Sequence, residues 1–149
     1  MRKYILSFIL IVALTGSTSS SGKFRILIAG NSTSSVSVPA KTVYLFSYFK
    51  GNGDGLHLAY SEDGLSWEVL KNDSIFLKPE IGKDKLMRDP SIVQDNNGVF
   101  HMVWTTGWWD QGIGYASSKD LINWSEQKNI PVMEKFKDTR NTWAPELFY

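Results

Sequence analysis

The sequence predicts an all-β protein built from blades of a β-propeller. Three observations lead to this prediction: a supersecondary repeat of 57 residues, strands that are apolar on both faces, and the lack of an apolar pattern with helical period after residue 21. Strands of this kind must be covered on both faces. A propeller does so because each four-stranded blade lies between two neighbours. We therefore expect two blades and one further strand.

The repeat aligns without gaps. Residues 55–67 (GLHLAYSEDGLSW) match residues 112–124 (GIGYASSKDLINW), and the same offset pairs residues 44–48 (YLFSY) with residues 101–105 (HMVWT). An immunoglobulin-like sandwich would give alternating strands without such a repeating unit. The identical pairs are Gly55 and Gly112, Ala59 and Ala116, Ser61 and Ser118, Asp63 and Asp120, and Trp67 and Trp124.

Each unit predicts strands separated by turns rich in Gly, Asp and Asn. The first unit predicts strands over residues 43–49, 56–60 and 67–70, and the second over 91–94, 99–106, 112–116 and 123–126. A third unit begins at residues 143–149 (WAPELFY), which resemble residues 88–94 (RDPSIVQ) and predict one more strand. Since a propeller closes with roughly four to eight blades, we expect the chain to be part of a longer one; the alternative is a ring of several copies.

The N-terminal segment predicts an exported protein. Residues 1–21 have the form of a signal peptide, with Arg2 and Lys3 before an apolar run at 4–14 that is too short to span a membrane. An uncleaved anchor is the alternative. Residues 22–42 are predicted to be a linker, in which 24–29 fit a terminal strand or a longer leader, and residues 43–149 a partial catalytic propeller. We expect a secreted or periplasmic protein without a membrane partner after cleavage.

Composition excludes several classes of function. The net charge is +1 with no basic run, and without Arg2 and Lys3 the chain has 14 basic and 15 acidic residues. This balance gives no reason to expect nucleic acid binding. There is no cysteine, which excludes disulfides, thiolate catalysis and cysteine metal sites. His57 and His101 lack metal-ligand spacing, so we expect both to be structural and expect no cofactor or metal site.

The segment with the clearest chemical potential is Arg88-Asp89-Pro90. It precedes the inner strand of its blade, and inner strands line the central channel of a propeller. Pro90 is expected to hold Asp89 in an extended conformation, and Arg88 is expected to keep the Asp89 carboxylate ionised by its charge. Taken alone, Asp-Pro is better explained as a turn that initiates a strand.

A wider set of motifs resembles the family 43 glycoside hydrolases. In order, these motifs are RDPSIV at 88–93, a Gly-aromatic loop at 107–111, SSKDLINW at 117–124 and WAPE at 143–146. The resemblance covers residues 86–149 and is weaker over 44–70. It implies a five-bladed propeller that cleaves arabinofuranosyl or xylosyl linkages in oligosaccharides or polysaccharides with inversion. It assigns the role of general base to Asp89, and it places the general acid Glu and an Asp that tunes its pKa beyond Tyr149.

Five residues are predicted to bind substrate. Trp108 and Trp109 lie in a loop, where the flat faces of two indoles suit the stacking of sugar rings. The resemblance brings the WAPE motif to the pocket, with Glu146 shaping it, whereas Trp67, Trp104 and Trp124 are expected to pack within the blades. The predicted substrate-binding residues are Arg88, Trp108, Trp109, Trp143 and Glu146.

Three other functions stay open at this point. A family 32-type fructan hydrolase also contains an Arg-Asp-Pro motif, but residues 24–85 lack the upstream Asn-Asp-Pro-Asn-type motif of its nucleophile. A non-catalytic glycan-binding propeller would use the same tryptophans and would lack the later pair of carboxylates. A truncated gene product without function is the third. Because the general acid is expected beyond Tyr149, the 149-residue chain alone is expected not to hydrolyse glycosides.

Overall fold

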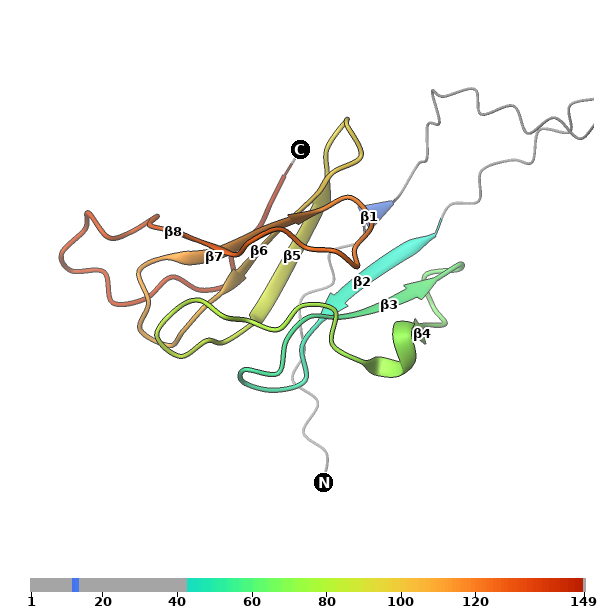
Figure 1. Cartoon of the computed structure of the whole chain (residues 1–149), viewed down its shortest axis with the longest axis horizontal. Helices are drawn as coiled ribbons and strands as arrows, with labels where there is room; N and C mark the ends of the chain where they lie inside the picture. Colours follow the sequence, from blue (N-terminus) through green and yellow to red (C-terminus); the bar gives the residue numbers. More distant parts are fainter. Residues whose placement is uncertain (1–11, 14–42, 149) are drawn as a thin grey trace, which may run out of the picture.

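The computed structural model describes residues 12–13 and 43–148 (Figure 1). Within them the chain forms two antiparallel sheets of four strands each. The first sheet contains β1 (Val12–Ala13), β2 (Tyr44–Tyr48), β3 (His57–Ser61) and β4 (Glu68–Val69), in that order. The second contains β5 (Arg88–Gln94), β6 (Phe100–Thr105), β7 (Ile113–Ser118) and β8 (Lys128–Ile130).

The all-β prediction is confirmed. Both sheets are meanders in which each strand pairs with the next one along the chain, which is the form of a propeller blade. The one helical element among the described residues is a 3-10 turn, Leu70–Asp73, after β4. No helix in the described part of the chain has the length and apolar character that a membrane crossing requires. The number of blades and the closure of the ring stay predictions.

β1 falls within the predicted signal peptide, where Val12 pairs with Leu45 and Ala13 with Tyr44. The rest of the leader, the linker and the candidate strand at 24–29 lie outside the described residues. Export and processing therefore stay predictions.

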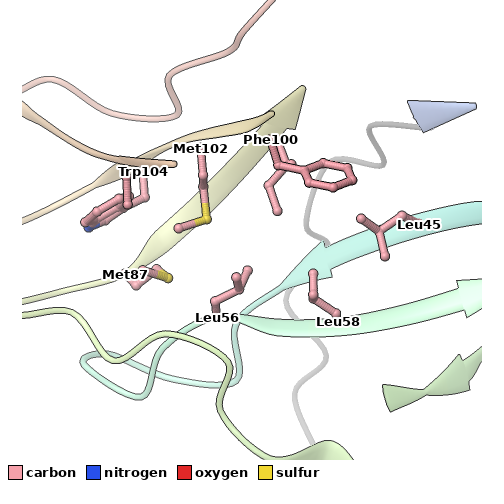
Figure 2. Packing of buried hydrophobic residues seen from close by; sticks show 9 residues of the cluster. Leu45, Leu56, Leu58, Met87, Phe100, Met102 and Trp104 are labelled. Atoms are coloured by element: carbon pink, nitrogen blue, oxygen red, sulfur yellow. The ribbon is translucent and has the colours of Figure 1, made fainter. Parts of the chain in front are cut away.

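The hydrophobic core lies between the two sheets (Figure 2). Trp104, Met87 and Met102 from the second sheet and its entry are completely buried, and so is Leu56, just before β3. The two sheets are also joined by a hydrogen bond of 2.8 Å that Ser47 Oγ donates to the carbonyl of Pro90. The predicted core position of Trp104 is thus confirmed. The cluster consists of Leu45, Leu56, Leu58, Met87, Ile92, Phe100, Met102, Trp104 and Ala116.

The strand register corrects the predicted repeat by one residue. Tyr44 pairs with Ser61, and Phe100 pairs with Ser118, so β2 corresponds to β6 with an offset of 56, while β3 corresponds to β7 with an offset of 57. The difference arises in the connecting loops: eight residues (49–56) lie between Tyr48 and His57, and nine (105–113) lie between Trp104 and Gly114. The gap-free pairing of 44–48 with 101–105 is therefore wrong. Leu58 belongs to the core cluster but its counterpart Tyr115 does not, whereas Ala116 does, so opposite faces of the two blades meet in the core.

The polar turn after the third strand is built identically in both units. Ser61 Oγ accepts from the backbone N–H of Gly64 at 2.8 Å, and Asp63 Oδ1 accepts from the N–H of Ser66 at 2.7 Å. In the second unit, Ser118 and Asp120 accept from the N–H groups of Leu121 and Asn123 at 2.9 and 2.7 Å. Gly64 and Leu121 both have positive φ, of 74° and 63°. These local bonds explain why Ser and Asp recur in the sequence.

Trp67 and Trp124 follow the same turns and pack within the blades, as predicted. The Trp67 ring lies 5.5 Å from that of Phe46, while Trp124 packs on the core and donates from Nε1 to the carbonyl of Leu121 at 3.1 Å. Their structural role is confirmed.

The lowered pKa values of the turn aspartates lead us to expect a loss of stability in acid. The N–H groups of Ser66 and Leu65 hold the pKa of Asp63 well below its usual range, and the backbone and side chain of Asn123 do the same for Asp120. A lowered pKa stabilises the fold above the unfolded value of about 3.9, and this stabilisation is lost as the pH falls below it. We expect Tm to be constant between about pH 7 and 5 and to fall below about pH 4. In thermal melts across this range, the Tm of the double variant Asp63→Asn/Asp120→Asn should fall less in acid than the Tm of the unsubstituted protein. An equal fall in Tm for both proteins would contradict the prediction.

Two predicted strands are wrong. The predicted outer strand at 123–126 is replaced by β8, because Trp124 makes only an isolated bridge with Ser118 and the ladder with β7 resumes at Lys128. The strand predicted at 143–149 is not found in its described part, 143–148, because this segment forms no ladder of backbone hydrogen bonds with another described strand. The other strands lie within one to three residues of the predicted bounds.

Candidate active site

Asp89 lies in a β-bulge at the start of β5. Arg88 pairs with Thr105 and Ser91 pairs with Val103, so Asp89 and Pro90 together oppose one residue of β6, Trp104. Pro90 has no N–H to give to the ladder, which suits a bulge position. Asp89 has a φ of 51°, in the left-handed region. The predicted extended conformation is wrong, because the bulge overrides the preference of a residue before proline. A bulge re-aims the side chain that it contains.

A buried threonine holds the Asp89 carboxylate. Thr105 is 2% exposed, and its hydroxyl donates to Asp89 Oδ2 at 3.4 Å. The same Oγ1 accepts from the N–H of Ala144 at 2.9 Å. The hydroxyl therefore links Asp89 to the WAPE segment. The N–H of Leu147, the residue after that segment, donates to Ser91 Oγ at 3.2 Å.

The Arg88 guanidinium is directed to aromatic rings. Its central carbon lies 4.8 Å from the centre of the Phe49 ring and 4.9 Å from that of Trp108, and Nη1 donates to Asn52 Oδ1 at 3.1 Å. Within the described residues Arg88 forms no ion pair with Asp89, so the expected pairing is not found. Arg88 instead fixes the position of Trp108 through a cation–π contact.

Trp108 and Trp143 form one aromatic surface beside Arg88. Their ring centres are 5.8 Å apart in an edge-to-face arrangement, and the side chains are 38% and 49% exposed. Indoles that are fixed by neighbours yet open to solvent suit the apolar faces of sugar rings. The structure thus brings together four of the predicted residues, namely Arg88, Asp89, Trp108 and Trp143.

Two predicted substrate-binding residues lie outside this cluster. Trp109 is 62% exposed and lines a separate hollow with Lys83, Gln111, Thr139 and Arg140. Glu146 is exposed and makes no hydrogen bond or ion pair with another residue of the described chain. Ala144, two residues before Glu146, is linked to Asp89 through Thr105. No contact of the described chain directs the Glu146 carboxylate toward the cluster.

A comparison with protein families decides the assignment. The family model described as a probable glycosyl hydrolase domain, related to family 43, matches residues 40–149. The chain belongs to this family of glycosyl hydrolases. The match includes β2 to β8 and the WAPE segment, so the second blade, all of the first blade except β1, and the cluster around Asp89 lie within it. A search of curated proteins gave no match. A carbohydrate substrate follows from membership of the family.

The tryptophan loop of this glycosyl hydrolase domain is fixed by two aspartates that the sequence did not single out. Asp110 is 7% exposed and accepts hydrogen bonds from Thr106 Oγ1 at 3.0 Å and from the N–H of Lys83 at 3.1 Å. Asp84 Oδ2 accepts from the N–H of Trp108 at 3.0 Å. Because these carboxylates are occupied in holding the loop, the two indoles keep distinct positions.

Thr105, Asn52 and Phe49 are the other site residues that the sequence analysis missed. Phe49 and Asn52 belong to the first blade, and only the packing of the two blades brings them to Arg88. The register of β6 against β5 was the signal that could have found Thr105, since it pairs directly with Arg88.

The histidines have structural contacts. His57 is 1% exposed, with Nε2 at 2.8 Å from Asp54 Oδ1 and Nδ1 at 3.1 Å from Asp73 Oδ1. The second contact is within ion-pair distance, but its geometry is not that of a hydrogen bond. His101 contacts Tyr115 OH at 2.7 Å and Asp95 Oδ2 at 3.3 Å. Among the residues that the structure describes, no group of three or more His, Cys, Asp or Glu side chains is positioned to hold a metal ion.

Proposed function

We propose that the full-length protein is an exported, inverting glycosidase that acts on arabinofuranosyl or xylosyl linkages, with Asp89 as its general base. The observation that carries this proposal is the cluster at the start of β5, where Thr105 joins the bulged Asp89 to Ala144, next to Trp143, and Arg88 contacts Trp108. Trp108 and Trp143 would stack on the sugar ring, and Arg88 would hold Trp108 and bind hydroxyl groups. Membership of the glycosyl hydrolase family supports the reaction class.

The chemistry follows from the geometry of inversion. Asp89 would remove a proton from a water molecule as the water attacks the anomeric carbon, while a carboxylic acid on the opposite side of the sugar protonates the departing oxygen. The two carboxyl groups must be about 6.5–9.5 Å apart to leave room for the water. Thr105 holds Oδ2, and Oδ1 accepts no hydrogen bond from another described residue, which leaves it for the water. We propose that the acid comes from a later blade.

The stereochemistry of the product tests the proposal. Full-length protein would be incubated with 4-nitrophenyl α-L-arabinofuranoside, β-D-xyloside and β-D-galactoside, and the first-formed anomer would be followed by proton NMR. We expect release from the arabinofuranoside or the xyloside, with the sugar first appearing in the opposite anomeric form. First appearance of the retained anomer would contradict inversion. Binding of xylan or arabinan oligosaccharides without any hydrolysis would instead support a glycan-binding propeller.

A further inference from the structure

The two adjacent tryptophans of the 107–111 loop serve different surfaces. Trp108 packs against Trp143 and Arg88, whereas Trp109 lines a hollow of about 450 Å³ together with Lys83, Gln111, Thr139 and Arg140. A volume of this size lies within the range of small-ligand sites, which is about 300–1,000 Å³. The hollow therefore has room for one or two sugar residues.

The walls of the hollow are fixed by hydrogen bonds between the loop and residues 133–142. Gln111 Nε2 donates to the carbonyl of Thr139 at 2.5 Å, and the N–H of Thr142 donates to the carbonyl of Asp110 at 2.8 Å. Thr142 Oγ1 and the N–H of Met133 both donate to the carbonyl of Gln111, at 3.2 and 2.9 Å. Each of these bonds involves at least one backbone group, and together they hold the loop against residues 133–142. The hollow is therefore present before any ligand binds.

The side chains that line the hollow carry two positive charges and no negative charge. Neither Lys83 nor Arg140 forms an ion pair with an acidic residue of the described chain. The neighbouring Asp110 is buried and bonded to Thr106 and to the N–H of Lys83, and Asp84 is bonded to Trp108. Asp138 is exposed but does not line the hollow. An indole face with an ammonium and a guanidinium beside it is complementary to a sugar ring that bears an anionic group.

We propose that this hollow is a subsite for an acidic sugar residue, with the pyranose face of a hexuronate on Trp109 and its carboxylate between Lys83 and Arg140. The inference rests on the proposed function only in taking the substrate to be a glycan. It narrows that substrate to one with acidic substituents and gives Trp109, Lys83 and Arg140 a role in specificity. The chemistry of a sulfate ester is similar, so the test compares the two anions.

Binding by the full-length protein, measured by calorimetry, tests the subsite. The probes are a xylo-oligosaccharide, the same oligosaccharide with one glucuronosyl substituent, and the same oligosaccharide with one sulfate ester. We expect the glucuronosyl probe to bind about tenfold more tightly than the neutral one, a difference of the size that charge-assisted hydrogen bonds provide. The advantage should shrink in 1 M salt, because the charges are exposed. Tighter binding of the sulfated probe than of the glucuronosyl probe would overturn the assignment to a uronate.

Variants separate the subsite from the proposed reaction. Lys83→Gln/Arg140→Gln should abolish the advantage of the acidic probe and leave neutral binding unchanged, whereas the matched control Lys137→Gln, an exposed lysine that does not line the hollow, should keep it. Trp109→Ala should weaken the acidic probe more than the neutral one. Equal binding of acidic and neutral probes by the unsubstituted protein would overturn the inference even if Asp89-dependent hydrolysis is found. Preference for the acidic probe without such hydrolysis would support the subsite and count against the glycosidase.

Discussion

Replacing Asp89 by Asn is expected to lower kcat/KM of the full-length protein for its aryl glycoside by about 10²–10⁴-fold, the usual contribution of a general base. The amide keeps the size of the side chain, and its oxygen can still accept the hydrogen bond from Thr105 Oγ1, so the bulge should persist. What is lost is the capacity to take a proton from water. Thermal melting of the variant within about 2 °C of the unsubstituted protein would show that the fold is retained.

Two further measurements make the Asp89 test specific. Glu126→Gln, which removes an exposed carboxylate between β7 and β8, should leave kcat/KM unchanged. Azide, which needs no proton removed before it attacks, should restore turnover of Asp89→Asn and give a glycosyl azide of inverted configuration. If Asp89→Asn keeps kcat/KM within about threefold of the unsubstituted protein, far less than a base contributes, the assignment of Asp89 is wrong.

Gly114→Ala is expected to destabilise the protein by about 3 kcal/mol, at the upper end of the cost of overpacking a core. Gly114 pairs directly with Trp104, and a Cβ at this position would lie 2.5 Å from Cδ2 and Cζ2 of the indole. Trp104 is completely buried in the core between the sheets, so the ring has no free space into which to move (Figure 2). Urea unfolding of the full-length protein, followed by tryptophan fluorescence, would measure the loss.

Gly51 provides the matched control for this prediction. A Cβ at Gly51 has no atom within 4 Å, so Gly51→Ala should change the free energy of unfolding by less than about 0.5 kcal/mol, as is usual for surface substitutions. In addition, Trp104→Phe should recover part of the loss in Gly114→Ala, because the smaller ring makes room for the methyl group. Equal stability of Gly114→Ala and Gly51→Ala would show that β7 can move away from Trp104 and would contradict this account.

The sequence was most informative where structure is local. The Ser-Asp turns form within six residues, so their recurrence at Ser61, Asp63, Ser118 and Asp120 predicted both the turns and the strands beside them. One strand earlier, β2 and β6 are joined to β3 and β7 through loops, and these loops differ by one residue. The gap-free sequence match missed this difference, and only the pairing of the backbone revealed it.

For the candidate site, the sequence predicted which residues take part better than it predicted their arrangement. Arg88, Asp89, Trp108 and Trp143 do gather, but the conformation of Asp89 depends on the pairing of β5 with β6, which a rule for the residue before proline does not include. Likewise, adjacency in the sequence gave Trp108 and Trp109 one role, whereas Asp84 and Asp110 turn them to different surfaces. Contacts across blades and loops decide such questions, and a single sequence does not display them.

The kink at Asp89 has a counterpart in the next unit. Ala144 also precedes a proline and has a φ of 47°, close to the 51° of Asp89. The two units thus share a backbone turn before the proline, which carries a carboxylate side chain in one unit and a methyl group in the other. The side chain presented at this recurring position, Asp89 in one unit and Ala144 in the next, can thus change by a single codon replacement. The strands that support the turn stay as they are.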